Sequence, residues 1–221
     1  MIEVYKSGDF MRAEFAGDCD CDDGYTYETR GWYEVAVICT KCRDERLTCE
    51  QINKAKIPWE YRDASIDDFH DELLGYWVSS PQRGIMFIGP TGTGKTRRAC
   101  ALLIALIQAG KWVAFDHVGA LLRSIRAALR EDSSGHLFRR IHKAPFLVLD
   151  DLAELRTDWQ REIIADLIES RHRSQLITII TTNLSLEDIG SQLDSRGPRI
   201  VSRLRDMVVE VPVDGPDWRN L

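Results

Sequence analysis

The residues best suited to chemistry lie in one stretch, Gly89-Pro90-Thr91-Gly92-Thr93-Gly94-Lys95-Thr96. An apolar run, 85–88, precedes it, and an apolar helical pattern, 99–109, follows it. The spacing G-x-x-x-x-G-K-[ST] between a strand and a helix is typical of a nucleoside triphosphate site. Glycines let successive backbone N–H groups face the phosphates, and the helix adds its positive N-terminal end. We expect Lys95 to reach the β and γ phosphates of ATP, and the Thr96 hydroxyl to bind Mg²⁺.

Three polar side chains follow apolar strand patterns farther along the chain. Asp150 and Asp151 end the run 146–149, and Asn183 comes shortly after the run 176–180. We expect Asp150 to hold Mg²⁺, directly or through water, and Asp151 to polarise the water that attacks the γ-phosphate. The Asn183 amide can position that water or sense the γ-phosphate; the alternative is a simple turn residue.

Two arginines mark a short helix near the end of the chain. Pro198 is tolerated in its first turn, and Arg199 and Arg203, four residues apart, project from one face. In a ring or spiral of copies, such a face can insert an arginine into the nucleotide site of the neighbour and stabilise the transferring phosphoryl charge. The alternative is an arginine pair on the surface.

A row of six cations belongs to the segment between the second and third strand patterns. The helical pattern 118–130 and the shorter basic segment after it carry Arg123, Arg126, Arg130, Arg139, Arg140 and Lys143. These side chains could follow a nucleic-acid backbone, and a solvated helix face explains them equally well.

The cysteines favour a metal site near the start of the chain. Five of the six lie between residues 19 and 49, and we expect zinc to be held by Cys19, Cys21, Cys39 and Cys42. The single residue between the first two is a tight spacing, so Cys49 could replace one of them, with His70 a more remote substitute. Unligated thiols are the alternative, and we expect Cys100 to be a small buried hydrophobe.

Composition and charge place these motifs in separate parts of a globular chain. The chain has 221 residues, of which 44% are hydrophobic and 29% charged. Residues 1–80 carry 9 Lys and Arg against 18 Asp and Glu, a net charge of −9, and residues 81–221 carry 20 against 17, a net charge of +3. We expect an acidic cysteine-rich module over 1–55, a linker over 56–82 and an ATPase domain over 83–221. Apolar runs are too short to span a membrane, and no signal peptide is visible, which predicts a cytoplasmic location.

Strand and helix patterns alternate through the rear part of the chain. Strands are predicted at 85–88, 111–115, 146–150, 176–180 and 207–212, and amphipathic helices at 99–109, 118–130 and 159–173. This alternation indicates an α/β fold with a parallel sheet.

The order of these features resembles the bacterial replicative helicase loaders of the DnaC/DnaI type and their relatives, the IstB-type transposition ATPases. The features are the cysteine-rich module, Ile57-Pro-Trp-Glu-Tyr61 with Phe69, GPTGTGKT, LVLDD, TTN, and RIVSRL followed by Asp217-Trp-Arg219. The resemblance implies an AAA+ fold with a five-stranded parallel sheet in the order 5-1-4-3-2 and no lid domain. It also implies that Asn183 is sensor 1 and that Arg203 is the arginine finger, with Arg199 beside it. Asp151 stands where many AAA+ proteins have Glu, which leaves the turnover rate open.

The function implied by the resemblance is ATP-dependent loading of a hexameric replicative helicase onto single-stranded DNA. The helices of 117–143 would contact the DNA in a spiral assembly, and the front module would bind the helicase. ATP hydrolysis would be weak alone and stimulated by assembly or DNA. The nearest alternative is a transposition helper that delivers a transposase to target DNA. A nucleotide kinase, which would need an acceptor pocket and an arginine-bearing lid, and an ATP-holding scaffold are further alternatives.

Overall fold

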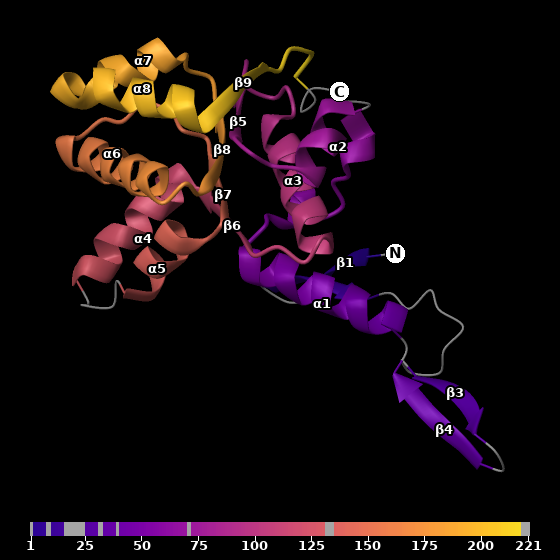
Figure 1. The fold of residues 1–221 in the computed structure, drawn as a ribbon. Helices are drawn as coiled ribbons and strands as arrows, with labels where there is room; N and C mark the ends of the chain where they lie inside the picture. The colour runs from indigo at the N-terminus through magenta and orange to yellow at the C-terminus, as the bar shows by residue number, and fades with distance from the viewer. Residues whose placement is uncertain are drawn as a thin grey trace. The chain divides into compact units, whose positions relative to one another are not determined.

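A computed structural model describes residues 2–7, 10–15, 25–30, 33–38, 40–69, 72–130 and 135–217. The chain divides into two compact units, residues 1–63 and 64–221. The first unit holds two hairpins and a helix, and the second holds a parallel sheet with helices on both faces (Figure 1). The expected boundaries at residues 55 and 82 stay predictions.

Two antiparallel hairpins and one long helix make up most of the first unit. β1 (Ile2–Ser7) pairs with β2 (Phe10–Phe15), and β3 (Tyr25–Arg30) pairs with β4 (Tyr33–Ile38). The helix α1 (Thr40–Ala55) follows directly. Tyr, Phe, Val, Ile and Thr are common in the four strands, and these residues favour extended backbone.

One face of α1 is buried. Its Cys49, Ile52 and Ala55 are spaced three residues apart, so they lie on one side of the helix, and all three are buried. Arg62 follows the short helix η1 (Trp59–Tyr61) and donates from Nη1 to Asn53 Oδ1 at 2.7 Å. This hydrogen bond fastens η1 to α1.

The stretch 56–82, expected as a linker, carries secondary structure. Besides η1 it holds η2 (Ile66–Phe69) and α2 (Glu72–Ser79). In the second unit, η2 contacts the helix α3 (Lys95–Gln108) through ion pairing of Arg97 with Asp68 and stacking of Arg98 over the Phe69 ring. The segment 64–79 is therefore part of the second unit.

The sheet of the second unit has five parallel strands. They are β5 (Gly84–Ile88), β6 (Val113–His117), β7 (Phe146–Asp150), β8 (Ile177–Thr182) and β9 (Val208–Pro212). Their order across the sheet is β6-β7-β8-β5-β9, and every neighbouring pair is parallel. Read from the other edge, this is the order 5-1-4-3-2, so the predicted sheet is confirmed.

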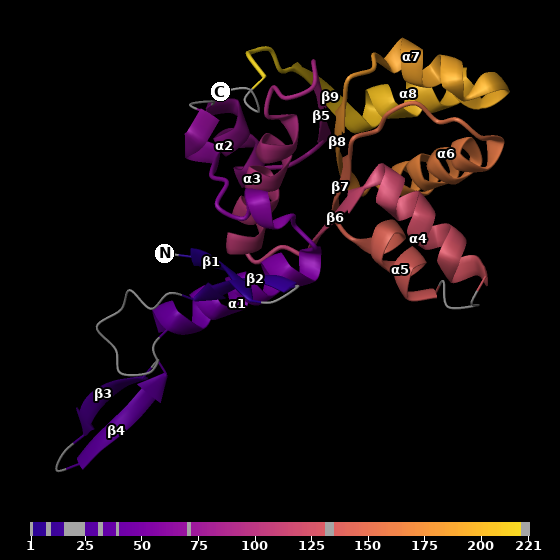
Figure 2. The ribbon, with the colours of Figure 1, turned by 180° about the vertical axis from the view of Figure 1, so that it is seen from behind.

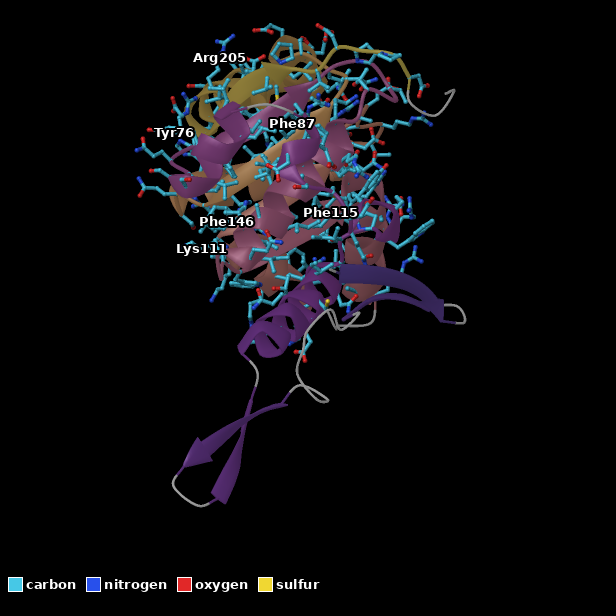
Figure 3. All side chains as sticks on the ribbon, turned by 90° about the vertical axis from the view of Figure 1, so that its right-hand side faces the viewer. Tyr76, Phe87, Lys111, Phe115, Phe146 and Arg205 are labelled. Atoms are coloured by element: carbon cyan, nitrogen blue, oxygen red, sulfur yellow. The ribbon has the colours of Figure 1, made fainter. Side chains whose placement is uncertain are left out.

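Helices cover both faces of this sheet. α2 and α3 lie on one face (Figure 2). The opposite face carries α4 (Val118–Arg130), α5 (Gly135–Lys143), α6 (Asp158–Arg173), α7 (Leu186–Gln192) and α8 (Gly197–Met207). Phe87, Phe115 and Phe146 are buried at the sheet, whereas Tyr76 of α2 is exposed (Figure 3). No helix among the described segments has the length and apolar character needed to cross a membrane.

Local sequence signals set the starts of α6 and α7. The Thr157 hydroxyl oxygen accepts a hydrogen bond from the backbone N–H of Gln160, and the Gln160 side-chain oxygen accepts one from the backbone N–H of Thr157. Ser185 and Asp188 form the same reciprocal pair at α7. Such capping boxes satisfy backbone donors that the first helical turn leaves open.

Arg171 of α6 is fully buried and holds three segments together. Its guanidinium donates to the carbonyl oxygens of Ile141, Ala144 and Ile177 and to the Thr178 hydroxyl, at 2.6 to 3.0 Å. Burial lowers the pKa of this group to about 9. A planar fork with five N–H donors can satisfy this many acceptors at once, so Arg171 ties the end of α5 to α6 and β8.

A pair of glycines lets α7 and α8 touch through their backbones. A Cβ atom at Gly197 would clash with the carbonyl oxygen of Gly190, and one at Gly190 would clash with the Val201 side chain. The two helices therefore pack closer at this point than any side chain would permit.

Candidate functional site

The loop between β5 and α3 has the backbone that phosphate binding requires. Gly92 and Gly94 have φ angles of 84° and 86°, a left-handed conformation that glycine adopts without steric cost. Gly94 is also the residue before the first turn of α3, whose N–H groups point toward the loop. The loop and the helix end together form a positively polarised cradle for an anion.

Lys95 lies folded along this loop. Its Nζ atom donates to the carbonyl oxygens of Gly89 and Pro90 at 2.8 and 2.6 Å. The Thr93 side chain donates to the same Pro90 oxygen at 2.9 Å, which stiffens the turn. The ammonium group is therefore held within the loop that the sequence assigns to the phosphates.

The C-terminal segment passes close to two glycines of the loop. The Val213 N–H donates to the Ile88 carbonyl at 2.7 Å, and a Cβ atom at Gly89 would clash with the Val213 oxygen. A Cβ atom at Gly92 would clash with the Asp217 carboxylate. Close approach of residues 213–217 is thus a second reason for glycine here, one that the sequence pattern alone does not indicate.

Thr96 and Asp150 are brought together at the carboxyl edge of the sheet. The Thr96 hydroxyl donates to Asp150 Oδ1 at 2.7 Å, although 54 residues separate the two in sequence. Asp150 is only 5% exposed, and its burial raises the pKa of the carboxyl group. A hydroxyl and a carboxylate at this distance fit the way proteins bind Mg²⁺, through one or two oxygen ligands and the phosphates of the nucleotide.

Thr181 of β8 completes this arrangement. Its hydroxyl donates to Asp150 Oδ1 at 2.7 Å and accepts from the backbone N–H of Asp151 at 2.9 Å. The sequence does not indicate this role of Thr181, because the contact depends on the pairing of β7 with β8. The described residues bring Thr96, Asp150 and Thr181 into one hydrogen-bonded group.

Asp151 projects from this group toward solvent. Its φ angle is 56°, and its side chain is 59% exposed. The left-handed conformation turns the chain sharply at the end of β7, so Asp150 points inward while Asp151 points outward. An exposed carboxylate beside a buried one is the arrangement expected for a group that activates water next to a metal ligand.

His117 is a further polar residue that the sequence analysis missed. It ends β6 opposite Asp150, and its Nε2 atom lies 3.4 Å from Asp151 Oδ2. The Gly119 N–H donates to Nδ1 at 3.2 Å, so the neutral ring carries its proton on Nε2, facing Asp151. The predicted strand ended at Phe115; had it been extended by two residues, the shared edge of parallel strands would have indicated His117.

Asn183 lies directly after β8 and is exposed. It follows the strand that bears Thr181, at the edge where β7 delivers both aspartates. Its predicted position at a strand end holds, and its role as a sensor of the γ-phosphate stays a prediction.

Arg199 and Arg203 lie on α8 and share one partner. Glu169 of α6 accepts from Arg199 Nη2 at 2.5 Å and lies 2.6 Å from Arg203 Nη1. The Arg199 side chain is 62% exposed and that of Arg203 19%. Because α8 and α3 cover opposite faces of the sheet, the arginines are separated from α3 of their own chain by the sheet (Figures 1 and 2).

The predicted DNA-contacting cations divide into different environments. Arg140 is paired with Asp116 at 2.5 Å, with both side chains largely buried, so it anchors α5 to β6 and does not belong to an exposed row. Arg126 stacks over the Trp159 ring at 4.5 Å from its centre. Five of the six cations are exposed: Arg123, Arg126, Arg130, Arg139 and Lys143.

Three of the predicted zinc ligands, Cys19, Cys21 and Cys39, lie outside the described residues, as does the side chain of Cys42. Cys49 is buried in α1 and Cys100 in α3. Among the residues that the structure does describe, no cluster of three or more His, Cys, Asp or Glu could hold a metal ion. The zinc site stays a prediction.

Comparison with known proteins identifies relatives of two kinds. The insertion sequence IS21 putative ATP-binding protein of Pseudomonas aeruginosa is 23% identical over 188 residues, covering 80% of this chain and 71% of the relative. The replicative helicase loader DnaC of Escherichia coli K12 is 26% identical over 164 residues, covering 72% of this chain and 60% of the relative. Among solved structures, the crystal structure of the DnaC helicase loader matches with a TM-score of 0.63 at 29% identity, covering 70% of this chain and 99% of that one.

The family comparison agrees with the fold and the loop. The model of the family described as IstB-like ATP binding protein matches residues 40–219, which include β5 to β9 and all the nucleotide-site residues. A parallel sheet in this order, the phosphate loop and these matches are those of a DnaC/IstB-like AAA+ ATPase. The chain belongs to the family of IstB-like ATP-binding proteins.

Proposed function

We propose that this protein hydrolyses ATP with Mg²⁺ at the carboxyl edge of the sheet and uses the cycle to place a partner protein on DNA. The observation that carries the catalytic part is the contact between the Thr96 hydroxyl and Asp150 Oδ1 at 2.7 Å, which joins the phosphate loop to the strand that ends in two carboxylates.

Each residue of the site has a distinct task in this proposal. The loop N–H groups and Lys95 bind the phosphates, and Thr96 and Asp150 hold Mg²⁺, which offsets phosphate charge. Asp151 orients and polarises the attacking water, and Asn183 senses the γ-phosphate or positions that water. Lys95 leaves the carbonyls of Gly89 and Pro90 when it turns to the phosphates.

We propose that turnover needs a second copy of the chain. Glu169 of α6 holds Arg199 and Arg203, and α6 and α8 cover the face of the sheet opposite α3. In a ring or spiral, Arg203 would reach the nucleotide of the neighbour, with Arg199 beside it. Hydrolysis would then be weak for an isolated copy and stimulated by assembly on DNA.

The partner we propose first is a hexameric replicative helicase. The similarity to the DnaC loader extends over most of that protein's solved structure and supports this choice. The acidic residues 1–55, with zinc on Cys19, Cys21, Cys39 and Cys42, would bind the helicase. The exposed cations Arg123, Arg126, Arg130, Arg139 and Lys143 would contact single-stranded DNA.

A transposition helper is the second candidate. The match to an insertion-sequence ATP-binding protein over 80% of this chain favours it. In that case the ATPase would deliver a transposase to target DNA, and single-stranded DNA would have no special effect.

The test uses the full-length Asp151→Asn variant, which we expect to bind ATP without hydrolysing it. Purified variant and ATP are mixed with a hexameric replicative helicase or with an insertion-sequence transposase, and complexes are separated by size. Lys95→Ala, which we expect to lose ATP binding, is the matched control. An ATP-dependent helicase complex supports loading; a complex with the transposase alone supports the second candidate. No ATP-dependent complex with either partner would contradict the proposal.

A further inference from the structure

The Thr181 hydroxyl forms hydrogen bonds with both acidic residues of the site. Thr181 is 1% exposed, on β8, and it belongs to neither the phosphate loop nor the strand that carries the acids. In the β7–β8 ladder Leu149 is opposite Ile180, so Thr181 is the next residue along and meets Asp150. Strand register therefore delivers its hydroxyl to the acids.

Both hydrogen-bonding functions of this hydroxyl are used. Its single proton goes to Asp150 Oδ1 at 2.7 Å, and its lone pair accepts from the Asp151 N–H at 2.9 Å. The bonds form a one-directional chain from the Asp151 peptide through Thr181 Oγ1 to the Asp150 carboxylate. Bonds in such a chain polarise one another, and in a buried setting they strengthen together.

Thr181 also holds the turn that aims Asp151. The φ angle of Asp151 is 56°, a region that side-chain-bearing residues rarely occupy and that surrounding contacts must maintain. The Thr181 hydroxyl binds the N–H of Asp151, and the Thr181 carbonyl accepts the N–H of Leu152 at 2.9 Å. Two consecutive peptides at the turn are thus fixed by one residue of the neighbouring strand.

We propose that Thr181 is a positioning residue for ATP hydrolysis, whose hydroxyl fixes the metal-binding Asp150 carboxylate and the backbone turn that presents Asp151 to the attacking water. This inference rests on the proposed roles of Asp150 and Asp151. Thr181 would contact neither the nucleotide nor the attacking water, and it would affect hydrolysis only by positioning the two aspartates.

The experiment compares three substitutions on the same strand. Thr181→Val keeps the shape and removes the hydroxyl; Thr181→Ser keeps the hydroxyl. Thr178→Val is the matched control, because Thr178 is equally buried but its hydroxyl bonds Arg171 and lies away from the acids. Each protein is measured for Tm, for ATP affinity with and without Mg²⁺, and for kcat under the conditions in which the wild type turns over.

We expect Thr181→Val to lower kcat by about 10- to 100-fold, as loss of a group that orients a metal ligand does. The gain in ATP affinity on adding Mg²⁺ should shrink, while affinity without Mg²⁺ stays as in the wild type. Thr181→Ser, which retains the hydroxyl, should have a kcat and a Mg²⁺-dependent gain in ATP affinity within about threefold of the wild type. Thr178→Val should lower Tm and leave kcat per folded molecule unchanged.

Three results would overturn the inference. The first is that Thr181→Val has a kcat and a Mg²⁺-dependent gain in ATP affinity within twofold of the wild type. The second is that Thr178→Val loses as much kcat and Mg²⁺-dependent affinity as Thr181→Val. The third is that Thr181→Ser is as impaired as Thr181→Val. A wild-type protein that binds ATP but does not hydrolyse it under any assembly condition would contradict the proposed function instead, and the Mg²⁺ effect on affinity would still test Thr181.

Discussion

Glu169 Oε1 lies 2.6 Å from Arg203 Nη1, and the second oxygen of the same carboxylate binds Arg199. One acid on α6 thus sets the positions of both arginines on α8. Hydrogen bonding to Arg203 holds the pKa of Glu169 below its usual value, so the group is charged at neutral pH. A guanidinium held in this way has less side-chain freedom left to lose when it binds an anion.

Arg203→Ala should leave ATP binding intact and remove assembly-dependent turnover. An arginine that stabilises transition-state charge is worth on the order of 10³-fold or more in kcat, so the loss should be of that size. Arg205→Ala is the control, since Arg205 lies on the same helix and pairs with exposed Glu187. The effect is measured as the rate of ATP hydrolysis at increasing protein concentration. A wild-type rate in Arg203→Ala would show that Arg203 is not the arginine finger.

Gly92→Ala should destabilise the loop and weaken ATP binding. The φ angle of 84° costs about 1–2 kcal/mol for a residue with a Cβ atom, and the new methyl group would clash with Asp217. Nucleotide titration and thermal unfolding check this. Gly110→Ala is the control: φ is also positive at 73°, but nothing lies within 4 Å of a Cβ atom there. If both variants bind ATP alike, contact with the C-terminal segment has no bearing on the site.

Arg171→Lys should destabilise the second unit although it conserves charge. A lysine presents three donors from a single point, so it leaves several of the four buried oxygen acceptors unsatisfied, at about 1–3 kcal/mol each. Denaturant unfolding measures the loss. Arg173→Lys, on the same helix but exposed, should stay within about 0.5 kcal/mol of the wild type. Equal stability of the two variants would contradict the structural role given to Arg171.

Low pH should lower the free energy of unfolding, partly because His142 is half-buried. Burial, and then the nearby charge of Arg171, lower the pKa of His142 below its usual 6.5. Below pH 6.5 the unfolded chain therefore binds a proton that the folded chain does not, and the free energy of unfolding falls as pH drops toward the folded pKa. His142→Gln should flatten this decline in urea unfolding between pH 7 and 5. An identical decline in both proteins would show that other groups cause it.

Much of the second unit can be predicted from sequence because its periodicity is strong. The predicted helix 118–130 and strand 146–150 coincide with α4 and β7, and the phosphate loop has its predicted place between strand and helix. Thr181 and His117 could not be assigned, because their roles depend on which residues lie opposite each other in neighbouring strands. The sequence predicts that Arg140 is one of a row of exposed cations. A basic helix pattern does not reveal that Arg140 pairs with Asp116 and is largely buried.

Sequence patterns were less informative for the first unit. Its hairpins and α1 were not predicted from sequence. Over β3, β4 and most of α1 the cysteine spacing indicates a metal site and carries no information on the backbone. The contacts of 64–69 with α3 were not predicted either, because a change in net charge near residue 80 does not show that Asp68 and Phe69 meet Arg97 and Arg98.

The close contact between Gly190 and Gly197 makes α7 and α8 move as one rigid unit. At Gly197 the backbone of α8 lies against the backbone of α7, and at Gly190 the Val201 side chain fills the remaining space, so a shift of one helix is transmitted directly to the other. α7 begins a few residues after Asn183, and α8 carries Arg203. We therefore expect a shift at the end of β8, beside Asn183, to move α8 and with it Arg203.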